Sequence, residues 1–102
     1  MTNKKTVVIA TATPKPEQTE AMQHYLKNVM PLLINNEGEV VYRGKVDSQL
    51  HGESSFKIVL VIRFPNEDIV RTLFESDEYQ SLAPYRDKGF KDFGIVLSSE
   101  MG

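Results

Sequence analysis

The sequence contains no cysteine and no tryptophan, and only two of its 102 residues are histidine. Without cysteine, disulfides, thiol catalysis and zinc–thiolate sites are excluded. Excess positive charge is also lacking, because 12 Lys and Arg residues stand against 14 Asp and Glu residues and give a net charge of −2. No basic field therefore exists to attract nucleic acid or an acidic membrane surface.

Long hydrophobic runs are missing as well. No apolar segment approaches the roughly 20 residues that cross a bilayer. The run at residues 6–10 is broken by Thr11, Thr13 and Pro14, whereas a signal peptide needs a longer run and a small-residue cleavage site. We therefore expect a cytoplasmic protein without membrane partners. With 102 residues, of which 40% are apolar, residues 1–102 suffice for one domain around one core.

Several motifs of cofactor chemistry are absent too. The chain has no glycine-rich phosphate loop, no nucleophile elbow, and no histidines and carboxylates at metal-ligand spacing. We therefore expect neither a metal nor a cofactor.

The most apolar stretch that is present spans residues 56–64. Side chains of a strand alternate between its faces. One face therefore carries Phe56, Ile58, Leu60, Ile62 and Phe64, and the other carries Val59 and Val61. A strand that is apolar on both faces needs cover on both. A chain of this length supplies helices for one face only, so the other face requires a partner.

Periodicity and capping signals predict the remaining elements. Strands are expected at residues 6–12, 39–47 and 92–99, and helices at 16–35 and from Glu67 onward. Pro31 should bend the first helix without stopping it, because the apolar stripe continues to Leu33. Gly38 or Asn36 is expected to take the left-handed cap of this helix.

Two capping residues organise the second helical region. Asn66 is a suitable N-cap for the second helix, and Ser76 is suitable for a short helical segment that follows. That segment should pass through Tyr79 and end near Pro84 and Gly89. Strand one should stop at Thr13 and Pro14, because proline donates no hydrogen bond to a central ladder.

The order βαββαβ predicts an α+β fold of the ferredoxin-like type, an antiparallel four-stranded sheet with two helices on one face. Right-handed crossovers place strands 6–12 and 56–64 in the centre. The helix-free face should then carry an apolar patch of Val8, Ala10, Val59, Val61 and Val96. Packing of two such sheets across a two-fold axis predicts a homodimer.

A family resemblance adds to this interpretation. Residues 76–86 contain the pattern Ser-x-Glu-Tyr-Gln-x-Leu-x-Pro-x-Arg, and they follow Phe64-Pro65 after one helix. With residues 31–33, Gly38, residues 43–44 and the final strand, this pattern resembles the domain-of-unknown-function family thirteen-thirty. That family is similar to the dimeric alpha-beta barrel superfamily. The resemblance implies activities that range from cofactor-independent monooxygenases and isomerases to haem-handling enzymes and small-molecule sensors, so fold alone does not fix the activity.

Arginine and tyrosine are the candidate ligand-binding residues. Arg43 and Arg86 form a possible cationic pair for a carboxylate or enolate, or they pair with neighbouring carboxylates and helix carbonyls instead. Tyr25, Tyr79 and Tyr85 are possible hydrogen-bond donors in a pocket between helices and sheet, and Tyr42 is a further phenol. A tyrosine is more often a core side chain with a solvated tip, and this is the alternative interpretation of each.

The two histidines, His24 and His51, are candidates for a haem ligand or general base. His24 falls on the polar side of the first helix and His51 in a predicted loop, which favours exposure to solvent. Neither has a partner nearby in sequence that would orient its ring.

Two functional hypotheses follow. In the first, a homodimer binds a small carboxylated or aromatic metabolite between helices and sheet, and acts on it without a metal or cofactor. In the second, the dimer is a non-catalytic module that senses a ligand or binds another protein. A space fully packed by Tyr25, Leu73 and Phe74 favours the second hypothesis, and a cavity lined by Arg and Tyr favours the first.

Overall fold

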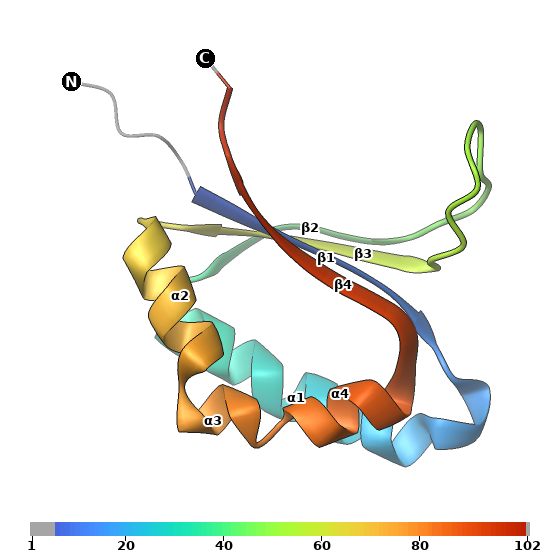
Figure 1. Cartoon of the computed structure of the whole chain (residues 1–102), viewed down its shortest axis with the longest axis horizontal. Coiled ribbons are helices and arrows are strands. Elements are labelled where there is room, and N and C mark those ends of the chain that lie inside the picture. The colour runs from blue at the N-terminus through green and yellow to red at the C-terminus, as the bar shows by residue number, and fades with distance from the viewer. Residues whose placement is uncertain (1–5, 102) are drawn as a thin grey trace.

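A computed structural model describes residues 6–101 and shows one antiparallel sheet with helices on one side (Figure 1). Its elements are β1 (Thr6–Pro14), the 3-10 turn η1 (Pro16–Gln18), α1 (Thr19–Asn35), β2 (Glu39–Lys45), β3 (Ile58–Phe64), α2 (Glu67–Glu75), α3 (Asp77–Gln80), α4 (Ala83–Gly89) and β4 (Phe90–Ser99). The strand order is β2-β3-β1-β4. The predicted ferredoxin-like fold, with β1 and β3 in the centre, is therefore confirmed.

The helix signals in the sequence are largely confirmed. Helix α1 continues through Pro31 to Asn35. Asn66 Oδ1 accepts a hydrogen bond from the Ile69 N–H at 3.0 Å, and Ser76 Oγ accepts one from the Tyr79 N–H at 3.2 Å. Both side chains satisfy backbone donors that a helix start leaves unpaired.

The segment after α3 differs from the prediction. Pro84 does not end a helical segment but lies in the first turn of a separate helix, α4. A first-turn N–H has no partner within the helix, so a proline is tolerated there. This extra helix packs against α1.

The turn after α1 also differs from the prediction. Glu37, with φ of 68°, takes the left-handed conformation that was expected of Gly38 or Asn36. Gly38 is required by space instead, because a Cβ there would lie 2.7 Å from the Leu33 carbonyl oxygen and 3.0 Å from the Phe64 ring. The Gly38 N–H donates to that carbonyl at 2.9 Å.

The predicted strand ends are wrong by two residues in places. Strand β1 continues to Pro14, which pairs with Phe90 at the start of β4, whereas β4 was expected to begin at residue 92. A proline is tolerated at the end of a strand, where the ladder no longer needs its N–H. Strands β2 and β3 are each two residues shorter than predicted at the hairpin that joins them.

The core lies between the sheet and the helices, and its largest fully buried side chains are Phe64, Ile62, Leu73 and Val8. The expectation that Val8 and Ala10 lie on the helix-free face is wrong. Val8 pairs with Ile62 and is buried, and Ala10 pairs with Leu60 on the helix side. Because residues 7–10 are all apolar, their pattern did not distinguish the faces, and a shift of one residue exchanges them.

Candidate functional site

A cavity of about 450 Å³ lies between the helix side of the sheet and helix α1. Pockets for small molecules have volumes of roughly 300–1,000 Å³. Most of the lining is apolar: Val8, Ala10, Ala12, Leu26, Val29, Met30, Leu33, Ile58, Val59, Leu60, Ile62, Phe74, Phe90, Phe93, Ile95 and Gly44. Tyr25, Arg43 and Lys45 are the polar residues of this lining whose side chains lie on the helix side, whereas Thr11 also borders the cavity but shares the helix-free face with Ile9. The space is therefore not filled by Tyr25, Leu73 and Phe74.

A β-bulge in edge strand β2 brings Arg43 to this cavity. Val40 pairs with Ile62, but Tyr42 pairs with Val61, so the register shifts by one residue at Val41. Arg43 then pairs with Leu60, which packs against the core on the helix side. Residues directly opposite each other in a sheet share a face. Without the bulge, a tyrosine would occupy the position that Arg43 takes.

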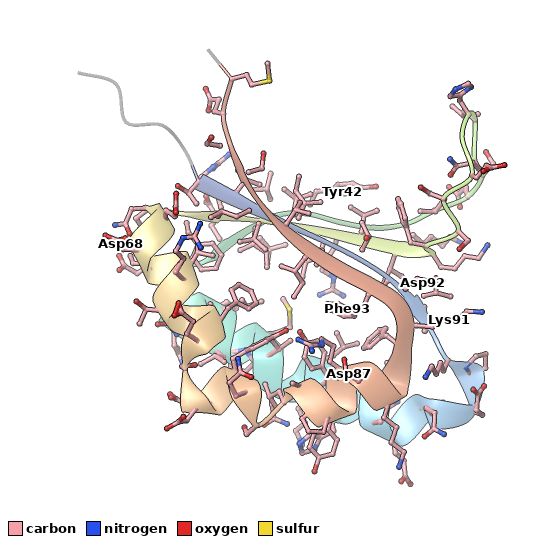
Figure 2. The ribbon with its side chains drawn as sticks, in the orientation of Figure 1. Tyr42, Asp68, Asp87, Lys91, Asp92 and Phe93 are labelled. Carbon is pink, nitrogen blue, oxygen red and sulfur yellow. The ribbon has the colours of Figure 1, made fainter. Side chains whose placement is uncertain are left out.

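A second irregularity shapes the opposite wall. The pairing of β1 with β4 shifts between Thr11 and Thr13, and Asp92 of β4 has a φ of 54°. Phe90 and Phe93 both line the cavity, with ring centroids 5.3 Å apart. In a regular strand, two residues three positions apart would point to opposite faces. Figure 2 shows Phe93 on the helix side of the sheet and Tyr42 on the helix-free side.

Tyr25 is the most buried polar residue of the lining, and hydrogen bonds link it to Tyr79 and, through Tyr79, to Arg86. Tyr25 Oη lies 2.9 Å from Tyr79 Oη, and Arg86 Nη1 donates to Tyr79 Oη at 3.1 Å. The Tyr25 ring packs edge-on against Tyr79, Phe90 and Phe93. Tyr25 is 4% exposed and Tyr79 2% exposed, so the pair is fixed by close packing.

The surroundings keep the Tyr25 phenol neutral and the Arg86 guanidinium positively charged. Burial, with a contribution from neighbouring Tyr79, raises the pKa of the Tyr25 phenol well above its usual value. Burial alone lowers the pKa of the Arg86 guanidinium, but hydrogen bonds with Asp87 and Tyr79 outweigh it, so that pKa is raised. The site therefore contains a neutral phenol in front of a permanent cation.

The predicted ligand-binding residues thus lie in three places. Tyr25 and Arg43 line the cavity, Tyr79 and Arg86 lie behind Tyr25, and Tyr85 lies elsewhere. The Tyr85 ring is 39% exposed and stacks on His24, with ring centroids 3.9 Å apart. His51 lies exposed in the loop between β2 and β3.

Lys45, Phe90 and Phe93 are lining residues that the sequence did not identify as part of a site. Lys45 follows Arg43 by two positions, so its alternation with Arg43 in β2 was a usable signal. The two phenylalanines were obscured by the bulge at Asp92. Within residues 6–101, no cluster of three or more His, Asp or Glu side chains is arranged to hold a metal ion. None of the helices in the same range is both long and apolar enough to cross a membrane.

These features define the class: a ferredoxin-like α+β domain with a cavity between its sheet and its helices. The chain belongs to the family described as Domain of unknown function (DUF1330), which matches residues 5–98. The predicted family is therefore confirmed. No curated protein matches the sequence.

Solved structures share the fold at low sequence identity. A protein of unknown function from Rhodopseudomonas palustris is 15% identical and has a TM-score of 0.80, covering 99% of this chain and 85% of its own. A dimeric ferredoxin-like protein of unknown function from Jannaschia sp. is 9% identical, with a TM-score of 0.70 and coverage of 96% and 99%. SnoaB, a cofactor-independent oxygenase from Streptomyces nogalater, is 9% identical, with a TM-score of 0.69 and coverage of 98% and 96%.

Proposed function

We propose that this protein is a homodimer whose cavity binds a small carboxylated or aromatic metabolite. On this proposal the protein acts on the metabolite without a metal or tightly bound cofactor, in the manner of the cofactor-independent monooxygenases and isomerases of this fold. The observation that carries the proposal is the cavity of about 450 Å³, with apolar walls and polar groups at a few positions. That combination is typical of small-molecule sites, in which apolar area supplies affinity and a few polar groups supply orientation.

The polar groups indicate the chemistry of the ligand. Arg43 gives one side of the cavity positive charge, and Tyr25 adds a phenol. Lys45, from the same face of β2, is 82% exposed and pairs with Asp47 at 3.9 Å, so Arg43 is the cation that we assign to the ligand. Arginine binds carboxylate and enolate oxygens through two parallel hydrogen bonds. Phe74, Phe90 and Phe93 provide edges and faces for an aromatic body. The oxygenase SnoaB, which shares this fold, is described as cofactor-independent, and this supports the mode of action that we propose.

The proposed dimer rests on the helix-free face of the sheet. Ile9, Val61 and Val96 lie side by side on this face, and Tyr42 continues the apolar surface over β2. Val96 is 55% exposed and Tyr42 is 56% exposed in the single chain. A second copy would cover this surface by sheet-on-sheet packing. The fold neighbour from Jannaschia sp. is described as dimeric, which supports the same arrangement.

A thermal-shift titration with 2-naphthoate tests the ligand class. At ten times its dissociation constant, a ligand stabilises the native state by about 1.4 kcal/mol, which raises Tm by roughly 5–10 °C in a domain of this size. We expect the shift to disappear in Arg43→Ala. The matched control is Arg71→Ala, because Arg71 lies on α2, is exposed and pairs with Glu67. A shift that persists in Arg43→Ala contradicts the proposal.

Catalysis is tested separately from binding. Oxygen uptake measured with phenolic and carboxylated aromatic substrates should be abolished by the same Arg43→Ala substitution. Ligand binding without any turnover would favour the second hypothesis, a non-catalytic ligand-sensing module. Sedimentation of a monomer at high micromolar concentration would contradict the homodimer.

A further inference from the structure

Arg86, Tyr79 and Tyr25 form a chain of hydrogen bonds behind the cavity. Arg86 fixes which atom donates in the first of these bonds. Arginine carries only donors, so Arg86 Nη1 must donate to Tyr79 Oη at 3.1 Å. The Arg86 guanidinium is held by two further contacts. Arg86 Nε donates to Asp87 Oδ1 at 3.0 Å, and Arg86 Cζ lies 5.9 Å from the Phe93 ring centroid. One acceptor position of the Tyr79 hydroxyl is therefore permanently occupied.

The hydroxyl groups of Tyr25 and Tyr79 each carry one proton that can be donated. One of these protons forms the 2.9 Å hydrogen bond between Tyr25 Oη and Tyr79 Oη, and either atom can be its donor. The other proton has no acceptor among the side chains and backbone of residues 6–101. Its location decides what the cavity offers to a bound molecule.

Burial determines where this second proton lies. Tyr79 is 2% exposed and is not among the residues that line the cavity, so a proton there would be enclosed without an acceptor. A buried donor without a partner costs stability. Tyr25 does line the cavity, so water or a bound molecule there is the acceptor left for its proton. The favoured order is therefore Arg86 to Tyr79, Tyr79 to Tyr25, and Tyr25 to the cavity.

We propose that Tyr25 donates its hydroxyl proton to a carbonyl or carboxylate oxygen of the bound molecule, and that Tyr79 and Arg86 are positioning residues that orient and polarise this donor. The inference rests on the proposed small-molecule function of the cavity and adds which oxygen chemistry the cavity selects. Hydrogen bonds in a chain strengthen one another, and the cation of Arg86 strengthens this one further. The donor thereby stabilises negative charge that develops on the bound oxygen.

The protonation state of the phenol agrees with this role. Burial raises the pKa of Tyr25, so the phenol stays protonated and donates instead of acting as a base. Arg43, from the edge strand, adds a charged donor to the cavity that Tyr25 lines. Together they favour ligands that carry a carbonyl, carboxylate or enolate oxygen on an aromatic body.

The test uses 2-acetylnaphthalene, with 2-isopropylnaphthalene as a probe of similar shape that lacks the oxygen. We expect Tyr25→Phe to weaken binding of the ketone about tenfold and to leave binding of the hydrocarbon unchanged. In the infrared spectrum, the carbonyl band of the bound ketone should lie at lower frequency in the wild type than in Tyr25→Phe. Tyr79→Phe and Arg86→Leu should give intermediate frequencies, because the donor remains but is less polarised.

Tyr85→Phe is the matched control, since Tyr85 lies outside the cavity and should change neither affinity nor frequency. Arg86 is only partly buried, so Arg86→Leu gives a folded variant even if Tyr79→Phe destabilises the core. Equal carbonyl frequencies in the wild type and Tyr25→Phe overturn this inference and leave the proposed function intact. Failure of both probes to bind overturns this inference, and failure of 2-naphthoate as well overturns the proposed function.

Discussion

Both faces of the sheet carry apolar side chains, but helices cover one face and leave the other exposed (Figure 1). On the helix side, side chains such as Ile62 and Phe64 are about 2% exposed, and the covering helices leave a partly open cavity of about 450 Å³. On the helix-free side, Val96 and Tyr42 remain more than half exposed, and no element of residues 6–101 covers them (Figure 1). The same strands therefore supply a core with a cavity on one side and an exposed apolar surface on the other.

The apolar content of a face therefore does not by itself decide whether that face binds a small molecule or another protein. On the helix side, a concave wall with a few polar groups suits a small ligand. On the other side, an exposed surface centred on Ile9, Val61 and Val96 suits another sheet. Variants that affect one face and spare the other test this division.

Phe64→Ala should produce the largest effect. Phe64 is a fully buried side chain of the helix side, so its truncation leaves a cavity and should lower the free energy of unfolding by about 3–5 kcal/mol. Urea denaturation measures this change. Leu50→Ala is the control, because Leu50 is 96% exposed in the β2–β3 loop and its truncation should change stability by less than about 0.5 kcal/mol. Similar losses in both variants would contradict the assignment of the core.

A pair of glycines compares the two faces directly. A Cβ at Gly89 would lie 2.7 Å from the Met22 backbone nitrogen, so Gly89→Ala forces α4 away from α1 and should cost about 1–3 kcal/mol. A Cβ at Gly94, on the helix-free side, would lie 3.5 Å from Thr11 Oγ1, which is an ordinary contact. Gly94→Ala should therefore leave the stability nearly unchanged. Chemical denaturation of both variants at several protein concentrations checks the difference.

Val96→Glu should weaken the proposed dimer without unfolding the subunit. Placing a carboxylate against a second sheet should raise the dimer dissociation constant at least tenfold, about 1.4 kcal/mol, because the charge loses its hydration. Ile34→Glu is a matched control on the outer surface of α1, where the side chain is 57% exposed compared with 55% for Val96. Analytical ultracentrifugation distinguishes the two. An unchanged dimer in Val96→Glu would place the interface elsewhere.

Alkaline pH should produce the smallest effect, and it is confined to the helix side. The folded state raises the pKa of Tyr25 above its usual value of 10.0. The neutral phenol therefore stabilises the fold fully below about pH 10, and this stabilisation is lost as the pH rises further, because the unfolded chain releases the proton first. Tyr25→Phe should show a shallower decline of Tm above pH 10 than the wild type, whereas Tyr85→Phe should follow the wild type. Parallel declines in all three proteins would exclude this linkage.

Some parts of the fold were predictable because they depend on local chemistry. The βαββαβ order, the caps at Asn66 and Ser76 and the passage of α1 through Pro31 all follow from residues close together in the chain. The central position of β3 followed from its apolar residues on both faces. Four of the five predicted ligand-binding residues lie at the cavity or behind it, but their arrangement did not follow from the sequence.

The parts that were not predictable depend on register. A bulge at Val41 exchanges the faces of Tyr42 and Arg43, and an irregularity at Asp92 directs both Phe90 and Phe93 to the helix side. Neither Val41 nor Asp92 is a glycine, the residue that would have signalled a bulge at that position. Residues 7–10 are apolar throughout, so the face of β1 was set by its pairing with β3.

The sequence alone determined the kind and order of the elements and the family, because these depend on periodicity, capping and a local motif. Only the tertiary structure decided which side chains meet. The cavity, the chain of hydrogen bonds from Arg86 through Tyr79 to Tyr25, and the place of Arg43 arise from strand register and helix packing. These join residues that are far apart in the chain, such as Tyr25 and Tyr79, which are 54 positions apart, and no local pattern encodes such a meeting.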